Sequence, residues 1–310
     1  MKKTVIVTGG AGFLGSHLVP ALVEAGYGVH VIDSLVNGKA ERLPKEATLH
    51  VLDIRKRGDL ISLFEKIASE AGGIHGVFHL AALPSVPFSI EHPEEAHSVN
   101  VDGTVNVFDA ARKARARRLV YSASSAAYGN PKELPAHEEL VPQPLSPYGL
   151  HKYFVEHLAR NYSLHYGLPT VSLRYFNIYG PGADPRGAYA QALIKFIDQR
   201  SKGQPITIVG DGLQTRDYIH ARDVARANIL ALESDKVGAG EVINIGSGKN
   251  PSILDIARLV GGPTVNIAPR VEPRDSRADI SKAKALLGWE PRVSLEEGIS
   301  ELKRLHGLTE

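Results

Sequence analysis

The stretch Thr4-Val-Ile-Val-Thr-Gly-Gly-Ala-Gly-Phe-Leu-Gly15 decides the fold of this 310-residue chain. A β-rich run at 5–7 leads into a turn with four glycines, and helical periodicity follows from residue 13 to residue 25. A second β-rich run comes next, at 29–32. A strand, a crossover helix and another strand in this order predict two parallel neighbours in one sheet.

The same alternation continues along the chain. Helical stretches, for example at 60–68 and 105–114, separate most of the further strand candidates, which are 49–51, 77–79, 119–121, 171–173 and 242–245. We therefore predict an α/β fold of the Rossmann type, a doubly wound parallel sheet with a smaller C-terminal substrate-binding lobe. The sheet domain is expected over residues 1–177, with a segment at about 212–250 returning to it, and the lobe mainly over 178–310.

Composition excludes several kinds of site and partner. Lys and Arg number 36 against 34 Asp and Glu, so the formal charge of +2 does not indicate a nucleic-acid partner. The chain has no cysteine, which excludes disulfides, thiolate catalysis and Cys-ligated metal, and no metal site is predicted. The opening MKKTVIVTGG reaches a glycine turn too early for a signal peptide, and no stretch has the ~20 apolar residues of a membrane helix. We expect a cytoplasmic protein with no membrane partner.

The glycine turn has the pattern of a dinucleotide site. Two overlapping motifs are satisfied, by Gly10, Gly12 and Gly15 and by Gly9, Gly12 and Gly15. Glycines allow the tight turn and let backbone amides approach a pyrophosphate at the helix N-terminus. Asp33 lies eighteen residues after Gly15, near the spacing expected of a ribose-binding carboxylate. Such a carboxylate repels a 2′-phosphate and so favours NAD over NADP. The positive charge of the nearby Lys39 is the opposing factor, because it could offset that repulsion.

A tyrosine and a lysine four residues apart form a candidate acid/base pair. Tyr148 and Lys152 lie on one face of a helix that Pro147 is expected to begin. A phenol has a pKa of about 10 and is a poor base unless a nearby cation lowers that pKa. Chance occurrence in an ordinary amphipathic helix is the alternative. Ser124, at the end of a β-rich run, is a candidate partner or a merely structural turn residue.

These residues occur in the order and spacing of a known family. From residue 4 to about residue 300 the chain resembles the extended short-chain dehydrogenases/reductases, and among them the UDP-hexose 4-epimerases. The stretches 85–90 and 184–190 look most like the branch that handles UDP-N-acetylhexosamines. Besides the motifs above, the resemblance rests on Asp53-Ile54, His79-Leu-Ala-Ala82, Asn100, Ser122 to Gly129, and Arg174 to Gly180.

The resemblance implies roles for named residues. The catalytic set is Ser124, Tyr148 and Lys152. NAD contacts are implied for Gly9, Gly12, Phe13, Leu14, Gly15, Asp33, Asn37, Asp53, Ile54, Leu80, Ala81, Ala82, Asn100, Ser122, Tyr148, Lys152 and Tyr175. UDP-sugar contacts are implied for Ser85, Ser124, Ser125, Asn177, Ala190, Ile208, Arg216, Arg270, Arg274 and Ser276. Among these, Asn177 and Arg216 would hold the diphosphate, with Arg270 or Arg274 as the second arginine.

The implied activity is NAD-dependent epimerisation at carbon 4 of a UDP-hexose through a transient 4-keto sugar. Ser125 and Ala126 replace the acidic residues of relatives that eliminate water, which argues against a 4,6-dehydratase. The alternatives are a UDP-glucuronate 4-epimerase and a 4-keto-sugar reductase with exchangeable cofactor. The glucuronate alternative is weakened by Gly182, which stands where the family usually has an arginine, although Arg186 is close.

Two finer expectations follow from the resemblance. Ser276, just before Ala278-Asp279, is the expected gate residue, and a small side chain there leaves room for an N-acetyl group. A one-residue slip in the alignment would put Asp275 or Arg277 there instead, and a surface serine is the other alternative. A homodimer is expected through the helix at 148–166 and the helix near residue 105. In the first helix Phe154, Leu158 and Tyr162 form a stripe, for which core packing is the alternative.

Overall fold

Seven parallel strands form the central sheet of the computed structural model, which describes residues 2–185, 192–269 and 273–308. The strand order is β10-β6-β5-β4-β1-β2-β3, so the chain reverses its direction of travel across the sheet between β1 and β4. Ligands of such sheets bind outside the carboxyl ends of the strands at this reversal. The strands are Thr4–Thr8 (β1), Gly28–Asp33 (β2), Thr48–Val51 (β3), Gly76–His79 (β4), Leu119–Ser124 (β5), Thr170–Tyr175 (β6) and Ala239–Ile245 (β10).

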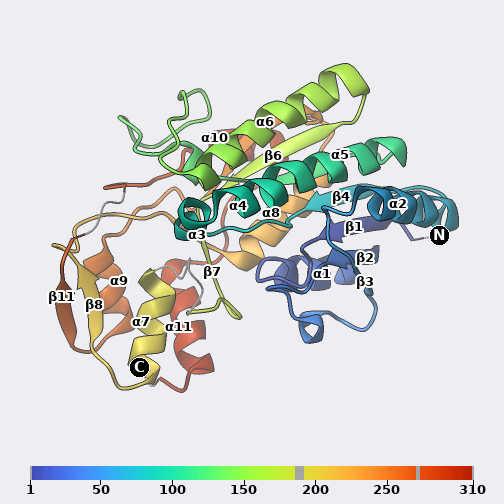
Figure 1. The fold of residues 1–310 in the computed structure, drawn as a ribbon. Helices are drawn as coiled ribbons and strands as arrows, with labels where there is room; N and C mark the ends of the chain where they lie inside the picture. The colour runs from blue at the N-terminus through green and yellow to red at the C-terminus, as the bar shows by residue number, and fades with distance from the viewer. Residues whose placement is uncertain (1, 186–191, 270–272, 309–310) are drawn as a thin grey trace.

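Helices cover both faces of the sheet, as the alternating pattern predicted (Figure 1). One face packs against α1 (Gly15–Glu24), α8 (Ala221–Glu233) and α10 (Ser281–Leu287). The other packs against α2 (Arg57–Ala71), α5 (Thr104–Lys113) and α6 (Pro147–Tyr166). Burial on both faces explains why the strands read as continuous apolar runs rather than as alternating ones. All five residues of β1 are buried.

A smaller lobe lies at the left of Figure 1, away from the chain's N-terminus. It holds two parallel pairs of short strands, β7 (Asn177–Tyr179) with β9 (Tyr218–His220) and β8 (Ile206–Val209) with β11 (Thr264–Ile267). Its helices are α7 (Ala192–Ser201), α9 (Ile253–Val260) and α11 (Leu295–Leu305). All of these elements except β11, whose residues are exposed, contribute to an apolar core apart from the two clusters that flank the sheet.

Short helices that the sequence did not predict surround the carboxyl edge of the sheet. After β4 come α3 (Val86–Glu91), α4 (Pro93–His97) and a π-helical turn, η2 (Ser98–Gly103). Two 3₁₀ turns, η1 (Ala40–Arg42) and η3 (Ser125–Ala127), complete the set. The wide π turn closes on a glycine, and a Cβ at Gly103 would lie only 2.7 Å from the Cγ1 of Ile54. π turns of this kind are frequent at functional sites.

The proline-rich stretch 131–147 is a loop, as predicted, up to the residue before α6 begins. Its only pairing among the described residues is an isolated bridge between Ala136 and Ala278. The amide of Ala136 donates to the carbonyl of Arg277 at 2.7 Å, and the amide of Asp279 donates to the carbonyl of Ala136 at 2.8 Å. No helix in the described part of the chain is both long enough and apolar enough to cross a membrane.

Candidate active site

The glycine turn between β1 and α1 is packed so closely that side chains would not fit. Gly9 has a φ of +69°, and a Cβ there would lie 2.6 Å from the amide nitrogen of Ala81. A Cβ on Gly15 would lie 2.2 Å from the carbonyl oxygen of Gly10. The turn therefore needs glycine for its backbone conformation and for its close approach to the end of β4. It leads directly into the N-terminus of α1, which fits the pyrophosphate of a dinucleotide.

Asp33 ends β2 beside this turn, where a ribose-binding carboxylate is expected. One of its oxygens accepts from the amide of Ala11 at 3.0 Å and the other from the amide of Leu35 at 2.8 Å. Two backbone bonds hold the carboxylate in place, and each oxygen keeps a lone pair for a further donor. Lys39 is exposed, and its backbone amide donates to the carbonyl of Ala11 at 2.9 Å. These residues fit the adenosine ribose of NAD.

A buried polar chain crosses from β1 through β4 to the π turn. The Oγ1 of Thr8 lies 2.7 Å from Nδ1 of His79, and Nε2 of His79 lies 2.9 Å from Oγ1 of Thr104, the first residue of α5. The hydroxyl of Thr104 donates to the carbonyl of Asn100 in the π turn at 2.8 Å. Burial lowers the pKa of His79 to about 3, so its ring is neutral. Asn100, in the π turn, accepts from the amide of Leu83 at 2.8 Å and donates to its carbonyl at 3.1 Å. The chain thus fixes the loop that carries the predicted cofactor contacts Leu80, Ala81 and Ala82.

The predicted acid/base pair is brought to the carboxyl end of β5. Tyr148 is 6% exposed and Lys152 is 4% exposed. The Nζ of Lys152 donates to the carbonyl of Ser122 at 2.6 Å and lies 3.4 Å from its hydroxyl. It also lies 4.9 Å from the ring centre of Tyr121 and 5.8 Å from that of Tyr148. Burial lowers the pKa of Lys152 to about 7, and the charge of Glu156 opposes that shift.

Ser124 is the last residue of β5, and Ser125 opens the 3₁₀ turn that follows. The hydroxyl oxygen of Ser124 accepts from the amide of Ala126 at 3.2 Å. Its hydrogen stays available for donation to a ligand, because a hydroxyl both accepts and donates. Both serines are half-buried. Ser124, Tyr148 and Lys152 therefore share the carboxyl edge of the sheet with the glycine turn.

A buried ion pair under the acid/base pair was not identified from the sequence. Glu156, one turn after Lys152, accepts from Nε and Nη2 of Arg174 at 2.7 and 2.6 Å. The guanidinium of Arg174 lies 4.5 Å from the ring centre of Tyr128, whose hydroxyl donates to Oδ1 of Asn244 at 2.8 Å. The four-residue spacing of Lys152 and Glu156 in α6 is a sequence signal that could have indicated Glu156. Its partner Arg174 on β6 could not be identified in this way, because that contact depends on tertiary packing.

In the smaller lobe, Asp217 joins the predicted substrate segments and was also missed. Asn177 donates from its amide and from its side chain to the carbonyl of Asp217, at 3.0 and 2.9 Å. The Asp217 side chain is fully buried, and burial raises its pKa. Its oxygens accept from the amide and hydroxyl of Ser247 at 2.6 and 2.7 Å, from the amide of Gly248 at 3.0 Å and from the amide of Ala278 at 2.9 Å. Ser276 is half-buried two residues before Ala278.

The predicted substrate arginines have different hydrogen-bond partners. Nη1 of Arg216 donates to the carbonyl of Thr215 at 2.8 Å and to that of Arg274 at 3.2 Å. The guanidinium of Arg274 is exposed and forms a two-bond ion pair with Asp211, at 2.9 and 3.0 Å. Ala190 and Arg270 lie outside the described residues.

Two further predicted contact residues are buried. Ile208 has no exposed surface and lies in the core of the lobe, on β8. Tyr175 is 7% exposed, about as little as Tyr148, and its hydroxyl donates to Oδ1 of Asn228 at 2.8 Å. The carboxylate of Asp53 accepts several hydrogen bonds from Arg55, the shortest at 2.6 Å. Ile54 is buried, and Asn37 is exposed.

Ser85 is the N-cap of α3, and its hydroxyl accepts from the amide of Phe88 at 3.1 Å.

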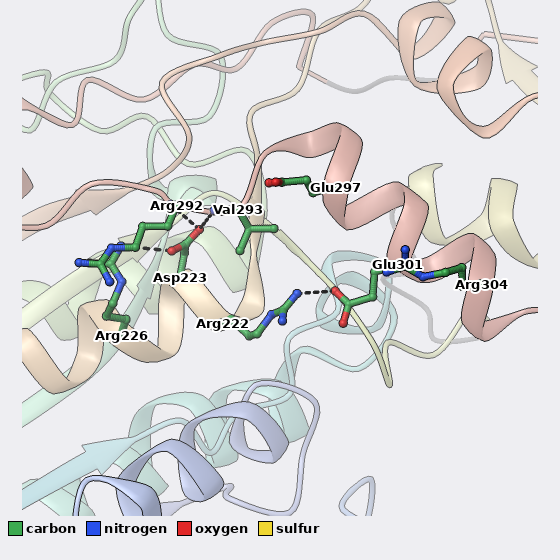
Figure 2. Close-up of a pocket in the computed structure, with 8 residues that line it drawn as sticks. All are labelled: Arg222, Asp223, Arg226, Arg292, Val293, Glu297, Glu301 and Arg304. Atoms are coloured by element: carbon green, nitrogen blue, oxygen red, sulfur yellow. Dashed lines mark hydrogen bonds and ion pairs between the residues drawn. The ribbon is translucent and has the colours of Figure 1, made fainter. Parts of the chain in front are cut away.

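A separate cavity of about 520 Å³ lies between α8 and α11 (Figure 2). Four of its charged groups form two ion pairs: Arg222 donates to Glu301 at 2.6 Å and Arg226 to Asp223 at 3.1 Å. The second oxygen of Asp223 accepts from the amide of Val293 at 2.8 Å. None of the predicted site residues lines this cavity. The ion pair between Arg222 and Glu301 links α8 to α11 across this cavity. The cavity is not part of the candidate active site.

Comparison with known proteins agrees with this arrangement. Residues 5–246 match the model of the NAD dependent epimerase/dehydratase family. The UDP-glucose 4-epimerase of Corynebacterium glutamicum is 35% identical over 305 residues, which cover 93% of this chain and 90% of that protein. The crystal structure of UDP-glucose 4-epimerase from Thermotoga maritima, with UDP-glucose, is 38% identical, with a TM-score of 0.90 over 98% of this chain and 99% of that one.

A second solved structure widens the range of relatives. The UDP-N-acetylglucosamine 4-epimerase of Methanobrevibacter ruminantium M1, in complex with UDP-N-acetylmuramic acid, is 35% identical. Its TM-score is 0.90, and the match covers 98% of each chain. With the glycine turn, Asp33 and the Tyr148/Lys152 pair at one edge of the sheet, the family model and these relatives lead to one conclusion. The chain is a member of the NAD dependent epimerase/dehydratase family.

Proposed function

We propose that this protein is an epimerase that inverts carbon 4 of a UDP-hexose with NAD as its resident cofactor. The observation that carries the proposal is the position of Tyr148 and Lys152 at the carboxyl end of β5, the same edge of the sheet that carries the glycine turn after β1. Residues 1–177, with the returning α8 and β10, would bind NAD, and residues 178–310 would mainly bind the UDP-sugar. The UDP-glucose 4-epimerases among the relatives support this assignment.

In the proposed reaction Tyr148 takes the proton of the sugar 4-hydroxyl and later returns it. The nearby ammonium of Lys152 favours the phenolate, because a positive charge stabilises the deprotonated form. Ser124 donates to the same sugar oxygen. Bound NAD would supply a reversible hydride acceptor for carbon 4. Inversion requires the 4-keto sugar to turn about its diphosphate link before the hydride returns to the opposite face.

A single assay without added cofactor tests this function. Purified protein is incubated with UDP-glucose, and proton NMR of the sugar follows the appearance of UDP-galactose. An absorbance spectrum of the protein before the assay reports whether NAD(H) is retained. We expect product formation with retained cofactor. Reduction of added NAD by UDP-glucose, without formation of UDP-galactose, would indicate a 4-keto-sugar reductase running in reverse, and no reaction with UDP-glucose or UDP-galactose would contradict the proposal.

The range of substrates is proposed to include the N-acetyl sugars. A serine at position 276 leaves room beside the sugar's 2-substituent, and one solved relative is a UDP-N-acetylglucosamine 4-epimerase. A UDP-glucuronate 4-epimerase is the second candidate, but it needs a cation for the carboxylate, and Gly182 stands at the expected arginine position. A panel of UDP-glucose, UDP-N-acetylglucosamine and UDP-glucuronate, compared by kcat/KM, separates these possibilities.

We also propose a homodimer that works in the cytoplasm. On α6, Leu150 is 55% exposed and Phe154 is 48% exposed, which leaves an apolar strip without cover in the single chain. Tyr162 was predicted to form a stripe with Phe154 and Leu158, but it belongs to the core. Packing of α6 against its copy would bury the strip. Light scattering at micromolar concentration tests the dimer, with Phe154→Glu as the variant expected to give monomers, and cell fractionation tests the location.

A further inference from the structure

The amide of Tyr148 has a hydrogen-bond partner from outside its own helix. At the start of α6, Ser146 is the N-cap, and its hydroxyl accepts from the amide of Gly149 at 3.1 Å. Pro147 has no amide hydrogen, and the amide of Leu150 donates to the carbonyl of Ser146 at 3.0 Å. That leaves the amide of Tyr148, one of the N-terminal amides that a helix cannot satisfy internally. It donates to the hydroxyl of Ser89 on α3, at 3.1 Å.

Ser89 is built to hold this amide. Its side chain has no exposed surface, and its hydroxyl donates to the carbonyl of Val86 at 2.8 Å. Donation to Val86 directs the lone pairs of the oxygen, so that acceptance from Tyr148 has a fixed geometry. A buried hydroxyl with both a donor and an acceptor partner is fully satisfied. Ser89 therefore restrains the backbone of Tyr148 from a second helix.

Helix α3 is itself anchored to the loop after β4, which carries predicted cofactor contacts. Its first turn is capped by Ser85, and the amide of Ser89 donates to the carbonyl of Ser85 at 3.0 Å. Two residues before that cap, Leu83 is held through both of its backbone groups by Asn100. The loop after β4 is thus joined at one end to the π turn and at the other to Tyr148. A shift of this loop would be transmitted to the start of α6.

We infer that Ser89 is a positioning residue that sets the place of the Tyr148 phenol relative to the sugar. The inference rests on the proposed epimerase function. Proton transfer depends strongly on distance and angle, so a small displacement of the catalytic residue costs rate without weakening substrate binding. Ser89 acts through the Tyr148 backbone, and it leaves the cofactor turn and the substrate lobe untouched.

The test compares two serines that hold opposite ends of α6. Ser163, near the end of the helix, donates to the carbonyl of Leu168 and accepts from the amide of Thr170, both at 3.0 Å. Ser163→Ala removes similar bonds far from Tyr148 and serves as the matched control. Ser89→Ala is expected to lower kcat roughly 10- to 100-fold. KM and the amount of retained NAD should stay within about twofold of wild type, whereas Ser163→Ala should keep its kcat.

A second variant separates the hydrogen bond from side-chain volume. Ser89→Cys keeps the shape of the side chain, but a thiol is a weak acceptor, so its kcat should fall nearly as far as that of Ser89→Ala. Hydrogen exchange of the Tyr148 amide, read by mass spectrometry, should be faster in both Ser89 variants and unchanged in Ser163→Ala. Folded Ser89 variants with wild-type kcat, or with kcat lost only in proportion to retained NAD, would overturn the positioning role. An inactive wild type would overturn the proposed function along with it.

Discussion

The Nζ of Lys152 lies 2.6 Å from the carbonyl oxygen of Ser122, so the end of β5 holds the cation that the candidate acid/base pair needs. The same ammonium lies over the rings of Tyr121 and Tyr148. Its position depends on α6 packing across β5, and it places the amine beside the phenol, where its protonated form stabilises the phenolate.

Removal of the Tyr148 hydroxyl should abolish most of the epimerase activity. For Tyr148→Phe we expect kcat to fall on the order of 10²–10⁴-fold, the usual contribution of a general acid/base group. NAD should still be retained, because the glycine turn and Asp33 are unchanged. Tyr153→Phe, on the same helix, is the control and should keep wild-type turnover. A folded Tyr148→Phe protein with near-normal kcat would remove Tyr148 from the mechanism.

Breaking the buried ion pair beneath Lys152 should cost stability. The side chains of Arg174 and Glu156 are 3% and 2% exposed, so either one left alone would be an unpaired buried charge. Glu156→Gln and Arg174→Met are each expected to lower the free energy of unfolding by about 3–5 kcal/mol. The double variant should lose much less than the sum, because it leaves no isolated charge. Urea unfolding of the four proteins measures this, and additive losses would show that the two side chains do not act as a pair.

Asp33 should select NAD over NADP. The carboxylate is held by the amides of Ala11 and Leu35 and would face a 2′-phosphate with like charge. Mass spectrometry of the cofactor extracted from the purified protein should identify NAD(H). Asp33→Asn should weaken NAD retention about 10- to 100-fold, since hydrogen bonds to a charged group are lost. Recovery of NADP(H) from the wild type would mean that Lys39 outweighs Asp33.

The width of the substrate pocket should depend on Ser276. Ser276→Tyr adds a large ring next to the buried Ala278 and is expected to remove activity toward UDP-N-acetylhexosamines selectively. Overfilling a packed site costs roughly 1–3 kcal/mol, or about 5- to 150-fold in kcat/KM. The measurement is kcat/KM for both sugar series in both proteins. Equal losses in the two series, or a wild type that ignores N-acetyl sugars, would show that Ser276 is not the gate.

Acid should destabilise the protein partly through Glu233, at the opposite end of the sheet. Burial raises the pKa of Glu233, but hydrogen bonds from Tyr27, His75 and Lys3 outweigh it and lower the pKa from 4.5 to about 2. The folded state therefore gains stability above pH 4.5 and loses it as pH falls from 4.5 toward 2.

The carboxylate is one third exposed, so after allowance for solvent screening we expect about 1–2 kcal/mol. Glu233→Gln should be less stable than wild type at pH 7, and the difference should narrow as pH falls through that range. Urea midpoints across the pH series give the answer. A constant difference would mean that the ionised carboxylate is not the source of the stability.

The parts of this protein that the sequence determined are local. The glycine turn needs a left-handed φ at Gly9 and has no space for a Cβ at Gly15, and both requirements are met within one continuous stretch. The strand and helix periods likewise depend on neighbouring residues, so the doubly wound sheet and the Tyr148/Lys152 face could be predicted. The family motifs then supplied the candidate cofactor and reaction class.

Tertiary structure alone decided the contacts between residues far apart in the chain. Ser89 accepts from the amide of Tyr148, 59 residues later in the chain, and Arg174 bonds Glu156 from 18 residues away. No periodic pattern in the sequence predicts either pair. The resemblance named Ile208 as a contact residue, but only the structure shows that it lies on β8 with no exposed surface, in the core of the lobe. Periodicity assigns a residue to an element, whereas packing of that element against others decides what its side chain touches.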